Sequence, residues 1–111
     1  ADNYYEQEIK FQEKIDKIQR SNLLQNPVTV DMINGILQVE FPEQMKSKLI
    51  SGTITVYSPK SKSNDRIFEI AELVNLRQSI DLSKMPAGIY QIRVDWNADN
   101  VSYYNEKTIN I

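Results

Sequence analysis

The chain has 111 residues, carries a formal net charge of -2 and contains neither histidine nor cysteine. This length corresponds to one domain. Without histidine and cysteine, the chain lacks the residues for Ser-His-Asp or cysteine-nucleophile catalysis, for disulfides, and for the usual zinc, haem and iron-sulfur ligand sets. The slightly acidic balance argues against DNA or RNA as the main partner, because phosphate binding favours a basic face.

The first segment, from Asn3 to about Asn22, is predicted to be a helix because no glycine or proline occurs before Pro27. Pairs of opposite charge at i,i+4 spacing support it, namely Glu6 with Lys10, Glu13 with Lys17, and Asp16 with Arg20. The apolar stripe of this helix is narrow and consists of Tyr4, Phe11, Ile15 and Ile18. We therefore expect a largely solvated stalk or strut, and a homodimer through this helix stays open as an alternative.

After Pro27 the hydrophobic period changes from 3.6 to 2, which predicts strands. Residues 28–32 and 37–41 alternate around Asn34-Gly35, a turn signal that predicts a first hairpin. A third strand opens at Ser51-Gly52, a fourth follows the polar loop 58–66, and a weaker fifth contains Ile80 and Leu82.

The last two strands have the clearest pattern in the sequence. One face of the first of them should be core, and it carries Tyr90, Ile92, Val94 and Trp96. A polar turn over 97–100 leads to the returning strand, whose Tyr103 should join the same core. About seven short strands with hairpin links predict a mainly β fold, an immunoglobulin-like antiparallel β-sandwich, with a small barrel as the structural alternative. The predicted organisation is a helix over 1–26 and a sandwich domain over 27–111.

Two tyrosines are predicted to contact a partner. Tyr103 and Tyr104 are neighbours on a strand and point to opposite faces, so Tyr104 is expected to be exposed. Tyr57 also points away from the predicted core side of its strand. We predict Tyr57 and Tyr104 as contact residues, and we predict no catalytic residue, no metal ligand and no cofactor.

The sequence offers two alternative metal sites. Positions 1, 3, 5 and 12 of a calcium loop are matched by Asp95, Asn97, Asp99 and Glu106. However, Asn100 replaces the turn glycine and no helix flanks the loop, so a hairpin is expected to separate these groups. The only soft copper(I) donors are three methionines spread over the domain, Met32, Met45 and Met85, and core packing explains them better.

The beginning of the chain suggests a nearby membrane. No window of about 18 apolar residues predicts a transmembrane segment within the sequence. The chain opens with Ala1 and not with methionine, so we expect a processed or truncated piece of a longer protein. Tyr4 and Tyr5 are predicted to lie at the membrane border, where amphipathic rings settle at the headgroup level. Packing of this pair on the domain is the alternative.

Motifs along nearly the whole chain resemble the FixH-like family of the Bacteroidetes type. The opening Asn3 to Glu8 resembles the segment just outside the single transmembrane helix of that family. The closing stretch Gly88 to Trp96, with a polar turn and Tyr103 after it, resembles the terminal hairpin of the family. Phe41-Pro42 and the strand opening at Ser51-Gly52 are similar as well. The sequence departs from the pattern in lacking the membrane helix and in having Asp99-Asn100 where Asp-Gly is commoner.

The resemblance implies a single-pass protein of the cell membrane with this domain in the periplasm. It implies a non-catalytic scaffold in assembly of a cbb-type cytochrome oxidase and associated copper delivery, whose partners are membrane proteins of oxidase assembly or copper transport. Docking is expected to use strand edges, the helix seam and exposed aromatics. The alternative is a secreted or surface-exposed β-sandwich binding or adhesion module of the cell envelope.

Overall fold

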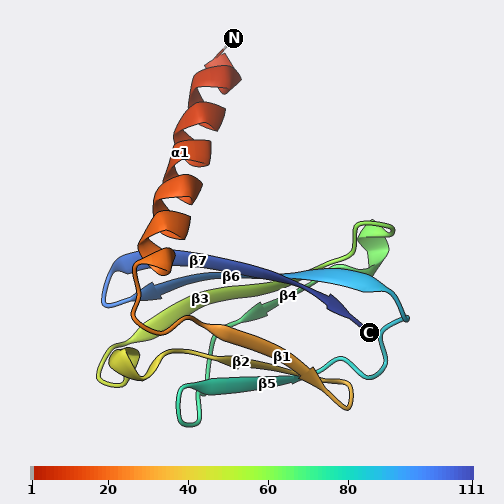
Figure 1. Cartoon of the computed structure of the whole chain (residues 1–111). Coiled ribbons are helices and arrows are strands. Elements are labelled where there is room, and N and C mark those ends of the chain that lie inside the picture. Colours follow the sequence, from red (N-terminus) through yellow and green to blue (C-terminus); the bar gives the residue numbers. More distant parts are fainter. Residues whose placement is uncertain (1) are drawn as a thin grey trace.

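The computed structural model describes residues 2–111, with side chains described from residue 5 onward. One helix precedes seven strands in two antiparallel sheets, so the predicted mainly β class with an N-terminal helix is confirmed (Figure 1). The elements are α1 (Asp2–Asn22), β1 (Thr29–Ile33), β2 (Ile36–Glu40), β3 (Ile50–Tyr57), β4 (Arg66–Glu69), β5 (Arg77–Asp81), β6 (Ile89–Ala98) and β7 (Val101–Asn110), with short 3-10 helices at Glu43–Met45 and Lys62–Asn64.

The two sheets form the layers of a sandwich. One sheet has the strand order β1-β2-β5 and the other has the order β4-β3-β6-β7, and every pairing is antiparallel. The chain crosses between the layers after β2, β4 and β5, which is the immunoglobulin-like arrangement expected from the sequence. In Figure 1, α1 rises from the β7 side of the four-stranded sheet and points away from the sandwich.

Tight turns fix the register of two hairpins. Asn34 and Gly35, between β1 and β2, have φ values of 51° and 80°, and Asp99 and Asn100, between β6 and β7, have 48° and 71°. Two consecutive positive φ values define the type I′ turn, whose twist matches that of the flanking strands. The second turn is shorter than the predicted 97–100, because β6 continues through Ala98.

Trp96 is the centre of the core between the sheets. Its side chain is fully buried, and the ring of Phe41 from the end of β2 meets it edge-on, with centroids 4.9 Å apart. Tyr103 of β7 stacks on it with centroids 4.5 Å apart. The indole Nε1 donates a hydrogen bond to Oδ1 of Asn105, so its polar atom is satisfied.

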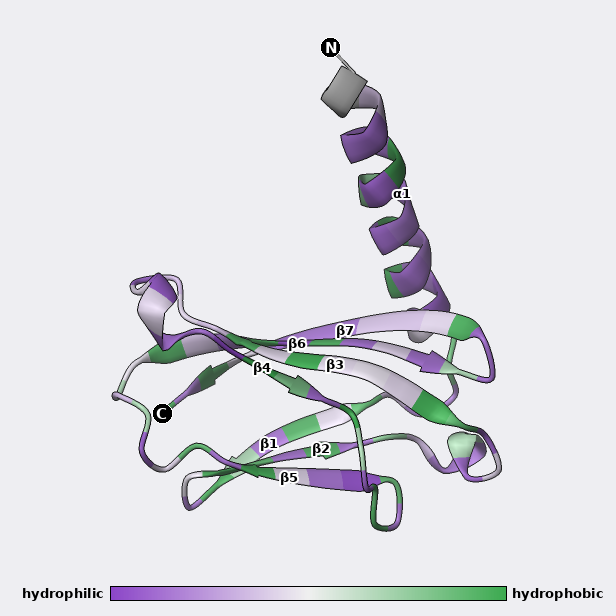
Figure 2. Cartoon of the chain, turned by 180° about the vertical axis from the view of Figure 1, so that it is seen from behind, coloured by the Kyte–Doolittle hydropathy of each residue, from purple (hydrophilic) through white to green (hydrophobic). Residues whose placement is uncertain are grey.

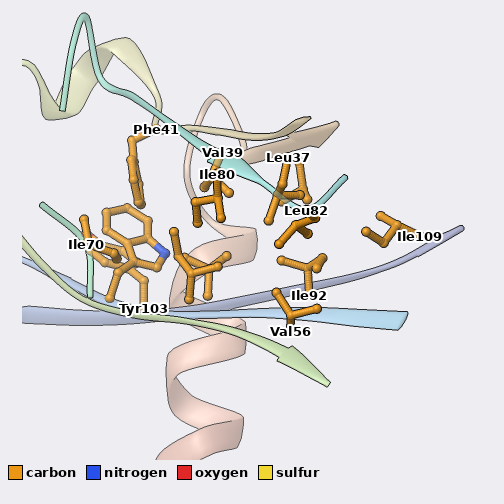
Figure 3. Packing of buried hydrophobic residues seen from close by; sticks show 14 of the residues in the cluster. Leu37, Val39, Phe41, Val56, Ile70, Ile80, Leu82, Ile92, Tyr103 and Ile109 are labelled. Atoms are coloured by element: carbon orange, nitrogen blue, oxygen red, sulfur yellow. The ribbon is translucent and has the colours of Figure 1, made fainter. Parts of the chain in front are cut away.

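The rest of the core follows the alternation along the strands. The side chains of both sheets point toward one another in the space between the layers (Figure 3). The five residues predicted for the core all lie in it, namely Tyr90, Ile92, Val94, Trp96 and Tyr103. The structure also places Leu37, Val39, Ile54, Val56 and Leu82 there. Each sheet therefore presents an apolar face to the other, which is what a two-layer fold needs.

Side chains link the two layers at both open sides of the sandwich. On one side, Nζ of Lys107 in β7 donates to the carbonyl oxygen of Val30 in β1 at 2.8 Å. On the other side, Nε2 of Gln78 in β5 donates to the carbonyl of Glu69 in β4, and its Oε1 accepts from the Ala71 amide. These contacts occupy backbone groups at strand edges, which would otherwise offer pairing sites to other chains.

Gly52 is predicted to be intolerant of substitution. It pairs with Trp96 across β3 and β6 at a φ of 136°, and a Cβ would lie 2.1 Å from the Asp95 carbonyl oxygen. Gly52→Ala should destabilise the fold by about 1–3 kcal/mol through its φ alone, and further through the clash. The measurement is urea unfolding. The control is Gly88→Ala, where φ is also positive but the nearest atom to a Cβ is 3.9 Å away. Equal losses in the two variants would contradict the role of the clash.

Candidate functional site: the outer sheet face beside the helix

The last turns of α1 are fixed to the free edge of β7. Oγ of Ser21, a buried residue, accepts a hydrogen bond from the backbone amide of Tyr104 at 2.9 Å. Nη1 of Arg20 donates to the carbonyl oxygen of Ser102 on the same strand. β7 is the last strand of its sheet, so these groups have no neighbouring strand to pair with. The helix therefore supplies the missing partners and its end is held in one place.

Two further contacts tie α1 to the outer face of the sheet. Nζ of Lys17 lies 2.9 Å from Oδ1 of Asp95 on β6. Nζ of Lys14 lies 4.9 Å from the centroid of the Tyr104 ring. The helix that the i,i+4 charge spacing supported is present, but none of these three charge pairs forms an ion pair among the described side chains. The strands hold their acceptors in fixed positions, and the helix cations turn toward them.

Tyr104 differs from its predicted position. The expectation that its side chain is exposed is wrong, because only 7% of the residue is accessible. The outer face of β7 lies under α1, so Tyr103 is buried by the core and Tyr104 by the helix. The hydroxyl of Tyr104 donates to Oε2 of Glu106 at 2.8 Å. Burial, together with this nearby carboxylate, raises the pKa of Tyr104 well above its ordinary value near 10.

Tyr57 lies on the same outer face, where it contacts Arg93. The guanidinium carbon of Arg93 is 4.2 Å from the centroid of the Tyr57 ring, a cation-π contact. Nε of Arg93 donates to Oε1 of Gln91 at 2.7 Å, which further fixes the side chain. Tyr57 is half-buried, and its predicted role as a contact residue stays a prediction.

A cleft of about 300 Å³ lies between α1 and this sheet, and we refer to it as the helix-sheet cleft. Its sheet side is lined by Thr53 and Thr55 from β3 and by Tyr104 from β7. Its charged lining consists of the cations Lys10, Lys14, Lys17 and Arg93 and the carboxylates Glu13 and Asp95. The lining has four cations against two carboxylates, and a third carboxylate, Glu106, lies beside it and accepts from the Tyr104 hydroxyl. The cleft is therefore locally basic, although the chain as a whole is slightly acidic. The sequence held a signal for this, because cations at 10, 14, 17 and 20 recur on one side of a helix.

The N-terminal half of α1 stands clear of the sandwich. Figure 2 shows it as mostly hydrophilic, with isolated apolar residues. Tyr5 is 69% exposed and Phe11 is 67% exposed, whereas Ile15 and Ile18 nearer the sheet are half-buried. The side chain of Tyr4 lies outside the described residues. The membrane border at Tyr4 and Tyr5 and the homodimer through the helix stay predictions. Over residues 2–111 no helix combines the length and apolarity that a bilayer crossing needs.

The groups of the calcium-loop alternative are engaged separately. Asp95 binds Lys17, Asn97 accepts a hydrogen bond from the Ser102 hydroxyl, and Asp99 accepts from the Leu49 amide. Over the part of the chain with described side chains, no three acidic groups gather closely enough to hold a metal ion. The three methionines of the copper alternative all contribute to packing. Met45 lies in the core, and Met32 and Met85 are partly buried against it. The hairpin thus places Asp95 and Glu106 on two neighbouring strands, β6 and β7.

The contact between Ser21 and the Tyr104 amide is predicted to stabilise the attachment of α1. Ser21→Ala leaves a buried N–H donor without its acceptor, which should cost about 1–3 kcal/mol. Hydrogen exchange at the Tyr104 amide should become faster, and urea unfolding gives the free energy. Ser47→Ala, at an exposed serine, is the matched control and should change neither quantity. Unchanged exchange at Tyr104 would contradict the assigned contact.

The raised pKa of Tyr104 predicts a pH dependence of stability. Because the folded state holds this proton more tightly than the unfolded state, the stabilisation is complete below about pH 10 and declines as pH rises further. Tyr104→Phe should lower the free energy of unfolding by about 0.5–1.5 kcal/mol at pH 7. This difference from the wild type should shrink above pH 10.

Urea unfolding of both proteins from pH 7 to 11 measures this difference, and the comparison cancels the titration of the other groups. Tyr5→Phe, on the exposed end of α1, is the control and should match the wild type throughout. A difference between Tyr104→Phe and wild type that stays constant over this range would contradict the assignment.

Comparison with known families identifies one match that covers nearly the whole chain. The FixH family model matches residues 1–110. Comparisons with curated proteins and with solved structures gave no significant match. FixH proteins are generally non-catalytic accessory proteins, membership suggests a role in oxidase assembly, and members are generally membrane-anchored with an extracytoplasmic domain. The expected resemblance is thereby confirmed, and the chain belongs to the FixH family.

Proposed function

We propose that this FixH-family chain is a non-catalytic scaffold that docks other membrane proteins during assembly of a cbb-type cytochrome oxidase and the associated copper delivery. The proposal includes a membrane anchor ahead of α1 and a periplasmic location for the sandwich. The observation that carries it is the geometry of α1, which is tied to the sheet at one end and stands clear at the other.

The length of α1 supports docking at a defined distance from a membrane. A helix of 21 residues spans about 30 Å, because each residue adds about 1.5 Å along the axis. An anchor that continued into α1 would hold the outer sheet face beside the stalk at this height. Extracytoplasmic parts of neighbouring membrane proteins occupy the same layer of space, and they are the surfaces that such a scaffold can meet.

The surface chemistry supports protein contact at the outer sheet face. Tyr57 and Arg93 form a stacked pair there, and tyrosine and arginine are enriched in the centres of protein interfaces. α1 covers this face only at the β7 side, so the remainder is open to a partner (Figure 1). The chain has no histidine or cysteine, so copper delivery in this proposal is carried out by the docked proteins while the sandwich positions them.

Site-specific photo-cross-linking in native membranes tests the proposal. A cross-linking residue in place of Thr55, on the outer sheet face, should capture an oxidase subunit, an oxidase-assembly factor or a copper-transporting ATPase, identified by mass spectrometry. The control position is Ile33, which is exposed on β1 of the other sheet and should not capture it. Equal capture from both positions, or capture of none of these proteins from Thr55, would overturn the proposal.

A further inference from the structure

We infer that the helix-sheet cleft binds the carboxylates of an acidic, extended segment of the partner protein. The inference rests on the proposed docking function and names the chemistry of the contact. It starts from the charges that the fold brings together from two distant parts of the sequence, α1 and the β3-β6 pair.

Three of the four cations in the cleft lack a carboxylate partner among the described residues. Lys17 is already bound to Asp95, but Lys10, Lys14 and Arg93 form no ion pair within the described part of the chain. Lys14 and Arg93 lie against the rings of Tyr104 and Tyr57, and such contacts leave N–H groups free to donate. The cleft therefore presents positioned donors that its own carboxylates do not occupy.

Two of these cations, Arg93 and Lys14, are held in place before any ligand arrives. Arg93 is fixed by the ring of Tyr57 and by its hydrogen bond to Gln91. Lys14 is placed by the attachment of α1 to β7 through Ser21. Preorganised cations lose little side-chain entropy on binding, and a guanidinium can bind a carboxylate through two hydrogen bonds. The hydroxyls of the threonines on the sheet side of the cleft add further donors of the right kind for a carboxylate.

The size and charge of the cleft favour a short acidic protein segment over a lipid surface or a nucleic acid. A volume of about 300 Å³ is at the lower end of ligand pockets and accommodates a few side chains. Recognition of acidic lipids generally uses four to eight clustered cations, whereas here Glu13 and Asp95 are interspersed among the cations. The same carboxylates would repel the closely spaced phosphates of a nucleic acid. A segment with a few carboxylates meets the cations and avoids both acids.

Nuclear magnetic resonance titration of the 111-residue chain with a hexaglutamate peptide at low salt tests the inference. Saturable shifts should concentrate on the amides of Thr53 and Thr55 and on the Arg93 side chain. The double variant Lys10→Gln/Arg93→Gln should weaken binding at least about tenfold. Lys60→Gln/Lys62→Gln removes the same charge from the exposed loop between β3 and β4, outside the cleft, and should bind as the wild type does.

The variants remain informative if Arg93 contributes to folding, since Lys10→Gln alone changes an exposed residue and should weaken binding severalfold. Equal weakening by the two double variants, or shifts that never saturate, would overturn the inference. If inorganic phosphate bound at the same residues as tightly as the peptide, the cleft would be a site for a free anion. This result would overturn the inference of a bound protein segment. A third result would be that the chain binds vesicles of equal parts phosphatidylcholine and phosphatidylglycerol and fails to bind the peptide. That result would overturn the inference and identify a lipid surface as the ligand.

The two proposals fail separately. The peptide titration uses the isolated chain, and the cross-linking uses the protein in its membrane. Cross-linking from Thr55 to an oxidase or copper-transport protein without peptide binding would leave the proposed function standing and remove only the carboxylate chemistry. If the peptide binds but no such cross-link forms, the cleft is shown to bind carboxylates, and the proposed role in oxidase assembly is contradicted.

Discussion

The hydrogen bond between the Ser21 hydroxyl oxygen and the Tyr104 amide is the contact on which the rest of the candidate site depends. An edge strand leaves backbone groups that must find partners, and here the partner comes from a helix instead of another strand. This contact fixes where α1 leaves the sandwich. The fixed end also determines where the lysines nearer the N-terminus of α1 lie relative to the sheet. Together with the contacts of Arg20 and Lys17, it holds the helix wall of the helix-sheet cleft in place.

The sheet supplies the other wall, and its rigidity comes from the aromatic core. Trp96 fills the space between the layers, with Phe41 edge-on to its ring and Tyr103 stacked on it. On the same strand, the neighbouring side chains at Asp95 and Arg93 point outward, because alternate residues of a strand face opposite ways. A well-packed inner face therefore positions the outer charges. The inner face of β6 belongs to the core, and its outer face belongs to the helix-sheet cleft. A substitution that shifts β6 in the core therefore also shifts the charges of the cleft.

Most of the sandwich was predictable because its signals are local. Alternation of apolar residues marks a strand, and Asn34-Gly35 allows a type I′ turn, whatever the remainder of the chain does. The position of Tyr104 was not predictable in this way. Alternation correctly separates the two faces at Tyr103 and Tyr104, but it does not say what covers the second face. That depends on where α1 packs, and a mostly polar helix gives little sign of a buried side.

The charged residues of α1 show why local and tertiary interactions have to be weighed together. Spacing alone pairs Lys17 and Arg20 with acids one turn earlier, at a gain of only a few tenths of a kcal/mol per pair. A carboxylate or carbonyl held by a strand costs less ordering entropy, so these two cations bind β6 and β7 instead. Further toward the N-terminus, Lys10 lines the helix-sheet cleft and forms no ion pair among the described residues. The helix thus changes along its length from an anchored end to an open one, and a segment bound in the cleft would extend the anchoring by further turns.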